Sequence, residues 1–362
     1  MTSTPVDDAT AWGLPHPIAS CDACDAMWLV PLEHLGHICT CARGVVRATS
    51  SDLPATQIEQ VLPLAVDART AAAMLHDACT PVPFRPPALD PATLMARAHL
   101  VWWPRWLLDA TAEGEWSSEA GFEETVQSSV EQLEGGTWVS RPQTQTRTRW
   151  EPRRGTLDRR VHNGAAAAVA DDATHAHLAR AARVSPAPFA AAHVHGSWIR
   201  LPEVSVDEAR PAALSAIRRA LATQVQQAVR AQSIREVQLR LHHSDETWTL
   251  RLHPIWHVPY TLDGTDYAVF VDGLSGRVRG PLLGSMKRAW KMAGGLGLGA
   301  AALLALALVL MAVSIALPPL LLVAAIAGGL ALLCGMTASY PPISVWMWNG
   351  RIAAQTTADE AE

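Results

Sequence analysis

Four of the six cysteines in this 362-residue chain lie close together in the segment 21–44. They form a C-x2-C pair and, after fourteen intervening residues, a C-x-C pair. Zinc prefers four ligands in a tetrahedron, and two short cysteine loops at about this separation supply them with little strain. The spacing therefore predicts a zinc ribbon over residues 15–48 with Zn²⁺ as its cofactor. The predicted ligands are Cys21, Cys24, Cys39 and Cys41.

The shortened second pair leaves the fourth ligand open. A C-x-C pair can bind one metal, but it lacks the usual turn whose backbone amides point at the sulfurs. His37 or His34 could therefore replace Cys41 as a ligand. Because a ribbon this short buries little apolar core, we expect metal binding to supply most of its folding free energy, on the order of 10 kcal/mol.

The C-terminal third of the chain contains a long apolar segment. Residues 293–338 carry no charge, and a bilayer core requires roughly 20 helical residues per crossing. Pro318 and Pro319 interrupt this segment near its middle. We therefore expect a transmembrane helical hairpin, with one helix over 293–316 and the other over 320–338.

The basic residues next to this segment predict its orientation. The chain has two lysines, Lys287 and Lys291, and both precede the first span together with Arg288. Positive charge favours the cytoplasmic side, so the N-terminal region and the tail 339–362 are both expected there. The predicted location is the cell inner (plasma) membrane, as a multi-pass protein. Three tryptophans occupy expected interfacial positions: Trp290, Trp346 and Trp348.

The N-terminal residues favour the same side of the membrane. They have neither a basic start nor an apolar run, so we expect no secretory signal. In a reducing compartment, paired cysteines are metal ligands more often than disulfides. The cysteines of the ribbon are therefore expected to bind a metal in the cytoplasm.

Residues 56–283 have the pattern of an α+β domain with an antiparallel sheet. Apolar residues recur every four positions in 208–232, which predicts an amphipathic helix. From residue 237 the sequence alternates in type and is interrupted at "SDE", "DGT" and "DGLSG", which predicts an antiparallel meander. The expected fold is thus a zinc ribbon, an α+β domain and a transmembrane hairpin.

Two neighbouring segments carry opposite charge. Residues 113–134 contain seven glutamates, whereas residues 141–160 contain seven arginines. The simplest interpretation is that the two segments pair with each other. The alternative is that the arginines, with Trp150, form a nucleic-acid-binding surface. The net charge of −5 argues against that alternative.

The order of these motifs resembles one bacterial family. "PRWLLD" at 104–109 and "PIWHVPYTLDG…VDGLSGRVRG" at 254–280, between a short cysteine ribbon and membrane helices, are similar to motifs of bacterial membrane-anchored zinc-ribbon proteins. These proteins carry a TFIIB-type zinc ribbon and are often labelled primosomal or helicase-like. In that family each cysteine pair is usually followed by Gly, whereas Asp25 and Ala42 stand here. The resemblance implies partners of the stomatin-like (SPFH) or phage-shock-A-like type.

These patterns favour two functions. The first is a membrane-anchored scaffold or adaptor whose ribbon recruits a protein partner, with self-association also open. The alternative is a membrane-tethered nucleic-acid-binding protein that uses the ribbon and residues 141–160. No catalytic constellation stands out, so an enzyme is not expected. Three histidine pairs are candidate ligands of a second metal: His175 with His177, His193 with His195, and His242 with His243.

Overall fold

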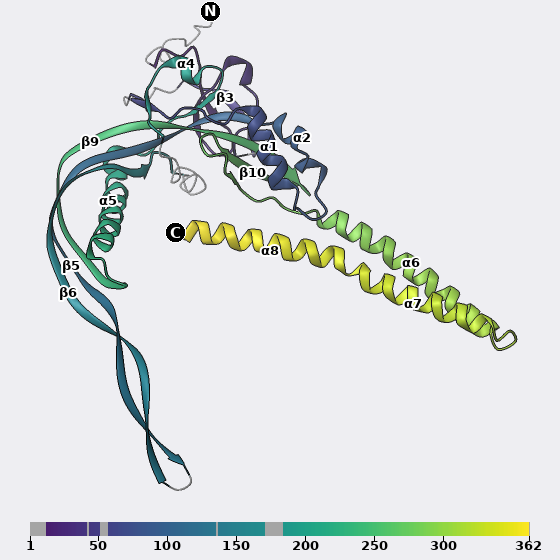
Figure 1. Ribbon diagram of the computed structural model, residues 1–362. Helices are drawn as coiled ribbons and strands as arrows, with labels where there is room; N and C mark the ends of the chain where they lie inside the picture. The colour runs from purple at the N-terminus through teal and green to yellow at the C-terminus, as the bar shows by residue number, and fades with distance from the viewer. Residues whose placement is uncertain (1–11, 42, 51–56, 135–136, 171–183, 362) are drawn as a thin grey trace, which may run out of the picture. The chain divides into compact units, whose positions relative to one another are not determined.

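The computed structural model describes residues 12–41, 43–50, 57–134, 137–170 and 184–361 (Figure 1). The strands of this part of the chain are β1 (Ile18–Cys21), β2 (Met27–Leu29), β3 (Val46–Ala48), β4 (Gln60–Val61), β5 (His99–Glu134), β6 (Thr137–Ala167), β7 (Ala187–Pro188), β8 (Trp198–Arg200), β9 (Ser233–Leu262), β10 (Thr265–Asp272) and β11 (Val278–Arg279). The helices are η2 (Leu32–His34), α1 (Ala68–Cys79), η3 (Pro87–Leu89), α2 (Pro91–Met95), α4 (Ala191–Val194), α5 (Val206–Val229), α6 (Met286–Val313), α7 (Leu320–Ala338) and α8 (Tyr340–Ala361).

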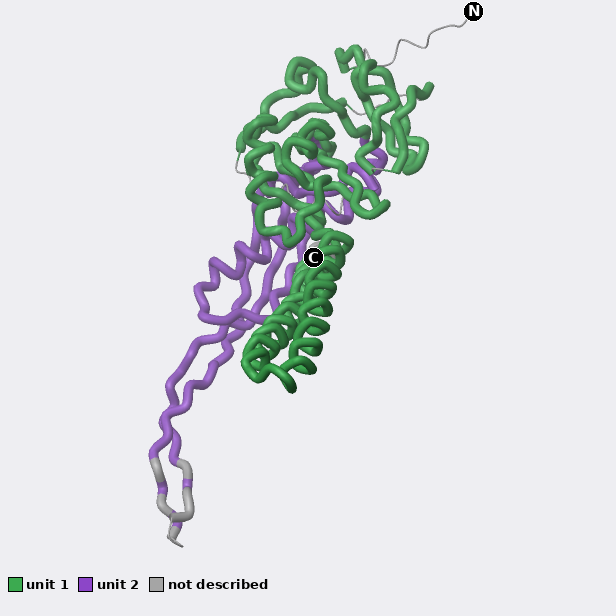
Figure 2. The backbone as a smooth tube through the Cα atoms, turned by 90° about the vertical axis from the view of Figure 1, so that its right-hand side faces the viewer, with its two compact units in different colours: residues 1–104, 171–201, 252–362 green, residues 105–170, 202–251 purple. Residues whose placement is uncertain are grey.

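The chain divides into two compact units (Figure 2). Unit 1 comprises residues 1–104, 171–201 and 252–362, and unit 2 comprises residues 105–170 and 202–251. Strands β5 and β9 are long enough to contribute residues to both units. The cysteine segment and the apolar helices both belong to unit 1.

The ribbon strands of unit 1 belong to a larger sheet. The hydrogen-bonded order of strands in this sheet is β11-β10-β9-β5-β8-β2-β1-β3. The ribbon joins it where Trp28 and Leu29 of β2 lie opposite Arg200 and Ile199 of β8. β8 also pairs in parallel with β5, so the sheet is mixed and the prediction of an antiparallel sheet is corrected at this position.

The core of unit 1 lies between α1, α2 and the strands β9 and β10. It includes Leu75, Leu94, Tyr260, Val271 and Leu282, all of them buried. The Asp67 side chain begins α1 by accepting a hydrogen bond from the Thr70 amide at 2.8 Å. Tyr260 donates its hydroxyl hydrogen bond to the Pro281 carbonyl, which fixes the segment leading into α6.

Unit 2 contains the β5–β6 hairpin and α5. In the register of the hairpin Glu124 lies opposite Arg147, and Arg149 forms an ion pair with Glu124 at 3.9 Å, which confirms that the acidic and basic segments pair with each other. Helix α5 begins at a capping box formed by Ser205 and Glu208, as its sequence pattern favours.

One expected strand break is absent. The sequence "SDE" was expected to separate two strands, but β9 runs through it without interruption from Ser233 to Leu262. Asp245, in the middle of this sequence, adopts a left-handed conformation with φ 52°. Aspartate tolerates that conformation better than most residues, so one irregular position replaces a turn. The turns at Asp263–Gly264 and after Asp272 are formed as expected.

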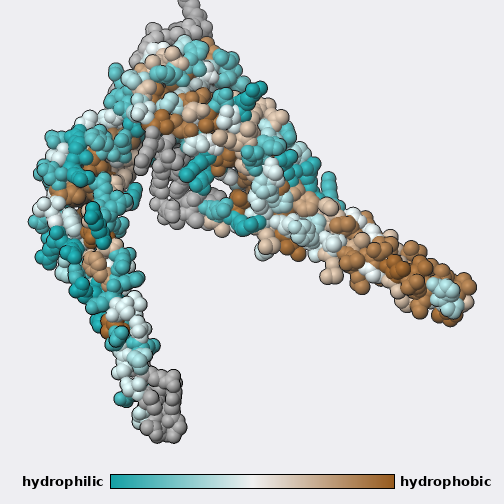
Figure 3. Space-filling view, in the orientation of Figure 1, coloured by the Kyte–Doolittle hydropathy of each residue, from teal (hydrophilic) through white to brown (hydrophobic). Residues whose placement is uncertain are grey.

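Two helical segments are long and apolar enough to cross a membrane, Met286–Val313 and Leu320–Gln355. Pro318 and Pro319 lie in the turn between them, as the sequence predicts. Large apolar side chains are exposed along α6 and α7, where Figure 3 shows a hydrophobic surface towards the turn. Exposed apolar surface of this extent indicates membrane association.

Helix α8 is bound to the segment that leads into α6. Trp348 donates a hydrogen bond to the Leu282 carbonyl at 2.7 Å. The Asn349 side chain accepts a hydrogen bond from the Gly284 amide at 2.9 Å and donates one to the Gly284 carbonyl at 3.2 Å. Val345 is fully buried beside them. The apolar hairpin is therefore attached to the rest of unit 1 at both of its ends.

Candidate metal centre

The first cysteine loop follows β1. The Cys21 amide donates to the Ala26 carbonyl at 3.0 Å, and the Asp25 amide donates to the Cys21 carbonyl at 3.1 Å. Asp25 has φ 55°, in the left-handed region where glycine is common. Because aspartate tolerates this region, the tight loop forms without the expected glycine.

The second loop is closed by its own backbone. Ile38 and Val45 form an isolated bridge, and the Cys39 amide donates to the Gly44 carbonyl at 2.8 Å. A Cβ at Gly44 would lie 2.6 Å from the Ala23 Cβ, so the close approach of the two loops requires glycine here. Ala42 lies outside the described residues.

Asp22 holds the two loops together. Its carboxylate accepts hydrogen bonds from the Val45 amide at 2.9 Å and from the Arg47 guanidinium at 3.2 Å. These donors hold the pKa of Asp22 below its usual value, because each stabilises the ionised form. Asp22 therefore remains charged and positions the second loop against the first.

The loops place four sulfur atoms around one point. The Sγ atoms of the four cysteines all lie within 4.8 Å of one another. Two of the separations are 3.7 Å, between Cys21 and Cys41, and 3.9 Å, between Cys24 and Cys39. A tetrahedral zinc with Zn–S bonds of about 2.3 Å requires sulfur atoms about 3.8 Å apart. The donor set and its dimensions therefore fit a tetrahedral metal ion.

Backbone amides also approach the sulfurs. The Ala23 amide donates to Cys21 Sγ at 3.4 Å, and the Arg43 amide donates to Cys41 Sγ at 3.5 Å. The second contact corrects the expectation that a C-x-C pair loses its amide donors. The donor comes from two residues beyond Cys41, outside the pair itself. Hydrogen bonds of this kind stabilise thiolate character at the ligand.

Burial disfavours free thiolates at this site. It raises the pKa of the Cys24 thiol to about 12 and that of Cys39 further still. At Cys41 burial acts in the same direction but is outweighed by hydrogen bonds, first from the Arg43 amide, so its pKa is lowered. A bound cation would stabilise the negatively charged thiolate form of these sulfurs, and binding would release their protons.

The two histidines considered as ligands belong to a neighbouring cluster. The Trp198 indole donates to His34 Nδ1 at 2.9 Å. The His34 and His37 rings have centroids 5.0 Å apart, and His37 is 5.8 Å from His99. Within the part of the chain that the structure describes, the group that could hold a metal contains four cysteines and neither histidine.

The ribbon also shares an apolar core with the sheet, which the sequence did not indicate. Trp28, Leu29 and Val30 are completely buried. The Trp28 ring makes an edge contact with Trp198 of β8 at a centroid distance of 5.7 Å. The expectation that the ribbon buries little apolar core is therefore corrected, and burial of these side chains contributes to its folding free energy.

The other histidine pairs do not belong to the cysteine loops. His175 and His177 lie outside the described residues. His193 and His195 lie at the end of α4, where the His195 ring is 6.3 Å from that of His16. His242 and His243 lie on β9.

Asp272 of the motif "VDGLSG" forms a buried polar pair with His253 of β9, which sequence reasoning missed. Asp272 and His253 are both buried, and Asp272 Oδ1 lies 2.8 Å from His253 Nε2. Asp272 also accepts a hydrogen bond from the Leu274 amide at 3.0 Å. Although burial would raise the pKa of Asp272, the hydrogen bonds from His253 and Ser275 hold it below its usual value. The pair fixes the β10–β11 turn.

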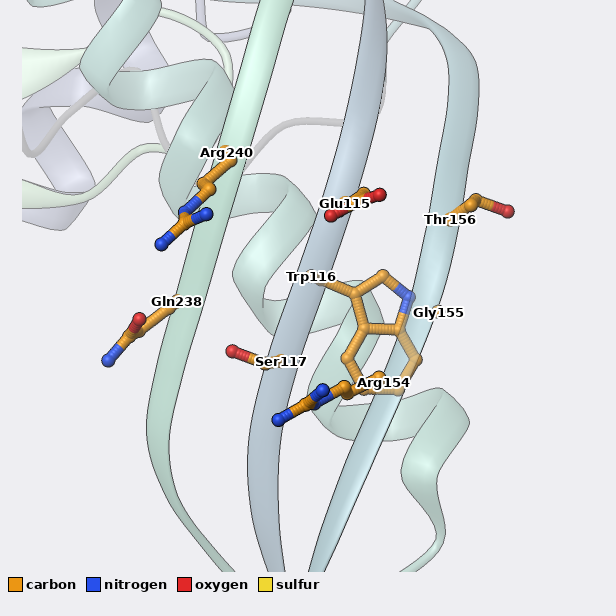
Figure 4. Close-up of a pocket in the computed structure, with 8 residues that line it drawn as sticks. All are labelled: Glu115, Trp116, Ser117, Arg154, Gly155, Thr156, Gln238 and Arg240. Carbon is orange, nitrogen blue, oxygen red and sulfur yellow. The ribbon is translucent and has the colours of Figure 1, made fainter.

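Unit 2 has an open polar pocket of about 620 Å³ (Figure 4). It is lined from β5, β6 and β9, with Glu115, Arg154 and Arg240 among its charged residues. The Trp116 ring lies against Gly155, where a Cβ would come within 2.7 Å of the indole nitrogen. The charged side chains that line the pocket are exposed and of both signs, which is typical of a solvated sheet surface.

Comparison of the chain with protein-family models, curated proteins and solved structures finds no match in any of the three. The resemblance to bacterial membrane-anchored zinc-ribbon proteins therefore depends on the motifs alone.

Proposed function

We propose that the protein is a membrane-anchored adaptor whose zinc ribbon recruits a protein partner at the cytoplasmic face of the membrane. The observation that carries this proposal is that one compact unit contains both the four-cysteine cluster and the two apolar helices. A ribbon in such a unit stays at the membrane surface. Its ligand set is Cys21, Cys24, Cys39 and Cys41.

Zinc is the metal that best suits this donor set. Four thiolates in a tetrahedron are typical of structural zinc sites, and such closed sites leave no position for a substrate. Iron–sulfur chemistry also uses four cysteines, but a cluster separates its ligands more widely than a single ion. The sulfur separations of 3.7 and 3.9 Å match a single ion.

The charge distribution supports the cytoplasmic orientation. Lys287, Arg288 and Lys291 lie in the first two turns of α6, immediately before its apolar part. The turn at residues 314–319 between α6 and α7 carries no charge. Under the positive-inside rule, both ends of the hairpin remain in the cytoplasm.

Exposed apolar side chains on the ribbon support a protein as the partner. Leu32 has 67% of its surface exposed, and Ile38, next to Cys39, has 52%. Apolar side chains held outward by a rigid loop are typical of protein contact sites. The metal would keep this surface in shape, since it fixes the loop that carries Ile38.

The arginines of β6 support a protein partner over nucleic acid, because several already have partners within unit 2. Arg153 and Arg149 pair with Glu151 at 2.8 and 3.0 Å. Arg160 donates to the Asp245 carbonyl at 3.1 Å.

The proposal can be tested by affinity purification of the full-length chain from native membranes in mild detergent. A specific partner should be retained by the wild type and lost from the double variant Leu32→Ser, Ile38→Ser. The matched control is Leu64→Ser, which changes an exposed leucine outside the ribbon and should retain the partner. Recovery of the chain in the soluble fraction, or a salt-dependent shift with DNA instead of a protein partner, would contradict the proposal.

A further inference from the structure

An apolar groove of about 630 Å³ lies between the start of α6 and the start of α8. Trp290, Ala293 and Gly294 line it from α6, and Ile343 and Trp346 line it from α8. Ligand pockets have volumes of roughly 300–1,000 Å³, so this groove is large enough for an extended hydrocarbon chain. Gly294 has no heavy atom within 4 Å of an added Cβ, which shows that space is available at this position.

The groove lies where the apolar helices meet polar sequence. Its two tryptophans, Trp290 and Trp346, are 62% and 70% exposed. Exposed tryptophans are enriched at the level of the lipid headgroups. If α6 and α7 cross the bilayer, the groove therefore opens towards the headgroup region and continues into the hydrocarbon.

Positive charge lies beside one edge of the groove. Met286, Trp290, Ala293 and Gly294 share one face of α6. With 3.6 residues per turn, Lys287 falls at the edge of that face and Lys291 about 40° further around the helix. Lys287 forms an ion pair with Asp263 at 3.1 Å but is 70% exposed, and Lys291 is exposed as well. Arg288 points elsewhere, because it donates to the Arg85 carbonyl at 2.6 Å.

We propose that this groove binds one anionic phospholipid, with an acyl chain between α6 and α8 and the phosphate at Lys287 and Lys291. The inference rests on the proposed membrane insertion and adds a specific lipid to it. The combination of an apolar groove and a basic edge favours this occupant. A neutral lipid would not use the lysines, and an apolar peptide would have to desolvate them.

Native mass spectrometry of the full-length protein in detergent, after incubation with phosphatidylglycerol or phosphatidylcholine, tests the proposal. The wild type should retain one phosphatidylglycerol in preference to phosphatidylcholine. Gly294→Leu should lose the bound lipid, because its side chain fills the groove. Gly299→Leu is the matched control, since Gly299 also has open space around it but faces away from the groove.

The double variant Lys287→Gln, Lys291→Gln should still bind lipid but lose the preference, by about fivefold per lysine. Equal retention of both lipids by the wild type would overturn the proposal, as would normal retention by Gly294→Leu or an unchanged preference in the lysine variant. Membrane insertion is tested separately by carbonate extraction. A chain that resists extraction but shows no lipid preference would refute this inference alone, whereas a chain released by carbonate would refute the proposed function.

Discussion

Asp22 and Asp25 shape the cysteine cluster although neither belongs to it. Asp25 supplies the left-handed turn of the first loop, and Asp22 bonds the second loop to the first through the Val45 amide. The cysteine spacing was sufficient to predict that these four cysteines lie close together. It could not predict the Asp22 contact, because a hydrogen bond between residues 23 positions apart leaves no local pattern.

At the residue scale, the first prediction concerns the fourth ligand. Cys41→Ser should weaken zinc binding of the full-length chain by more than about 100-fold, beyond the loss typical of substitutions around a ligand. His37→Ala should leave the affinity nearly unchanged, because His37 packs against His34 and lies outside the cysteine group. Competition with a chromophoric chelator measures both. The reverse result would make His37 the ligand.

A second prediction concerns His257, which is almost fully buried. Burial, together with the nearby His99, lowers the pKa of His257 from 6.5 to about 3. Between these values the unfolded chain binds more protons than the folded chain. The stability contributed by neutral His257 is therefore complete above pH 6.5 and is lost as the pH falls towards 3.

When the pH is lowered from 7.5 to 5.0, His257 should reduce the unfolding free energy by about 2 kcal/mol. His257→Leu should remove that part of the pH dependence. Chemical unfolding followed by tryptophan fluorescence measures it. His242→Leu, an exposed position on the same strand, is the control and should keep the wild-type slope. An unchanged slope in His257→Leu would show that His257 does not titrate in this way.

At the scale of elements, the sequence predicted local patterns better than distant pairings. The helix expected over 208–232 is α5, Val206–Val229, and the apolar hairpin is α6 and α7 with its turn at the two prolines. β8 was not predicted. It has only three residues, too few to show a periodic pattern, although in the sheet it lies between β2 of the ribbon and β5. The predicted break at "SDE" was wrong, because polar residues occur in exposed stretches of a strand as well as in turns.

The packing of α5 on β6 gives a third prediction. A Cβ at Gly164 would lie 2.7 Å from Ile217 Cγ1 and 3.1 Å from the Ala213 carbonyl oxygen, so α5 approaches β6 over a bare backbone. Gly164→Val should lower the unfolding free energy by about 1–3 kcal/mol through overpacking. Combined with Ile217→Ala, it should cost less than the sum of the two single variants, because the shortened side chain no longer clashes with the added valine. A double variant less stable than the sum of the two single variants would contradict the direct contact.

At the scale of the molecule, the apolar hairpin and the rest of unit 1 are joined at two points. The α6 end connects through the segment at Leu282 and Gly284, and the α8 end returns to the same segment through Trp348 and Asn349. The hairpin and the cysteine ribbon both belong to unit 1. This arrangement requires both ends of the hairpin to lie on the same side of a membrane.

The last prediction tests that requirement. With about 1.5 Å per residue, the 28 residues of α6 extend about 42 Å, enough to cross a hydrocarbon core of about 30 Å. The chain then turns at residues 314–319 and returns through α7. Fluorescent reporters fused at Met1 and at Glu362 should therefore both report the cytoplasm, and a reporter that is active only outside should be silent at both.

The charge rule supplies the control for this topology. Replacing Lys287, Arg288 and Lys291 by Gln and adding three lysines to the turn near Ile315, which is 88% exposed, should lower the fraction of chains with both ends inside. Reporters on opposite sides in the wild type would show a single crossing. They would also be incompatible with the hydrogen bonds between Asn349 and Gly284, because residues on opposite sides of a bilayer cannot be bonded to each other.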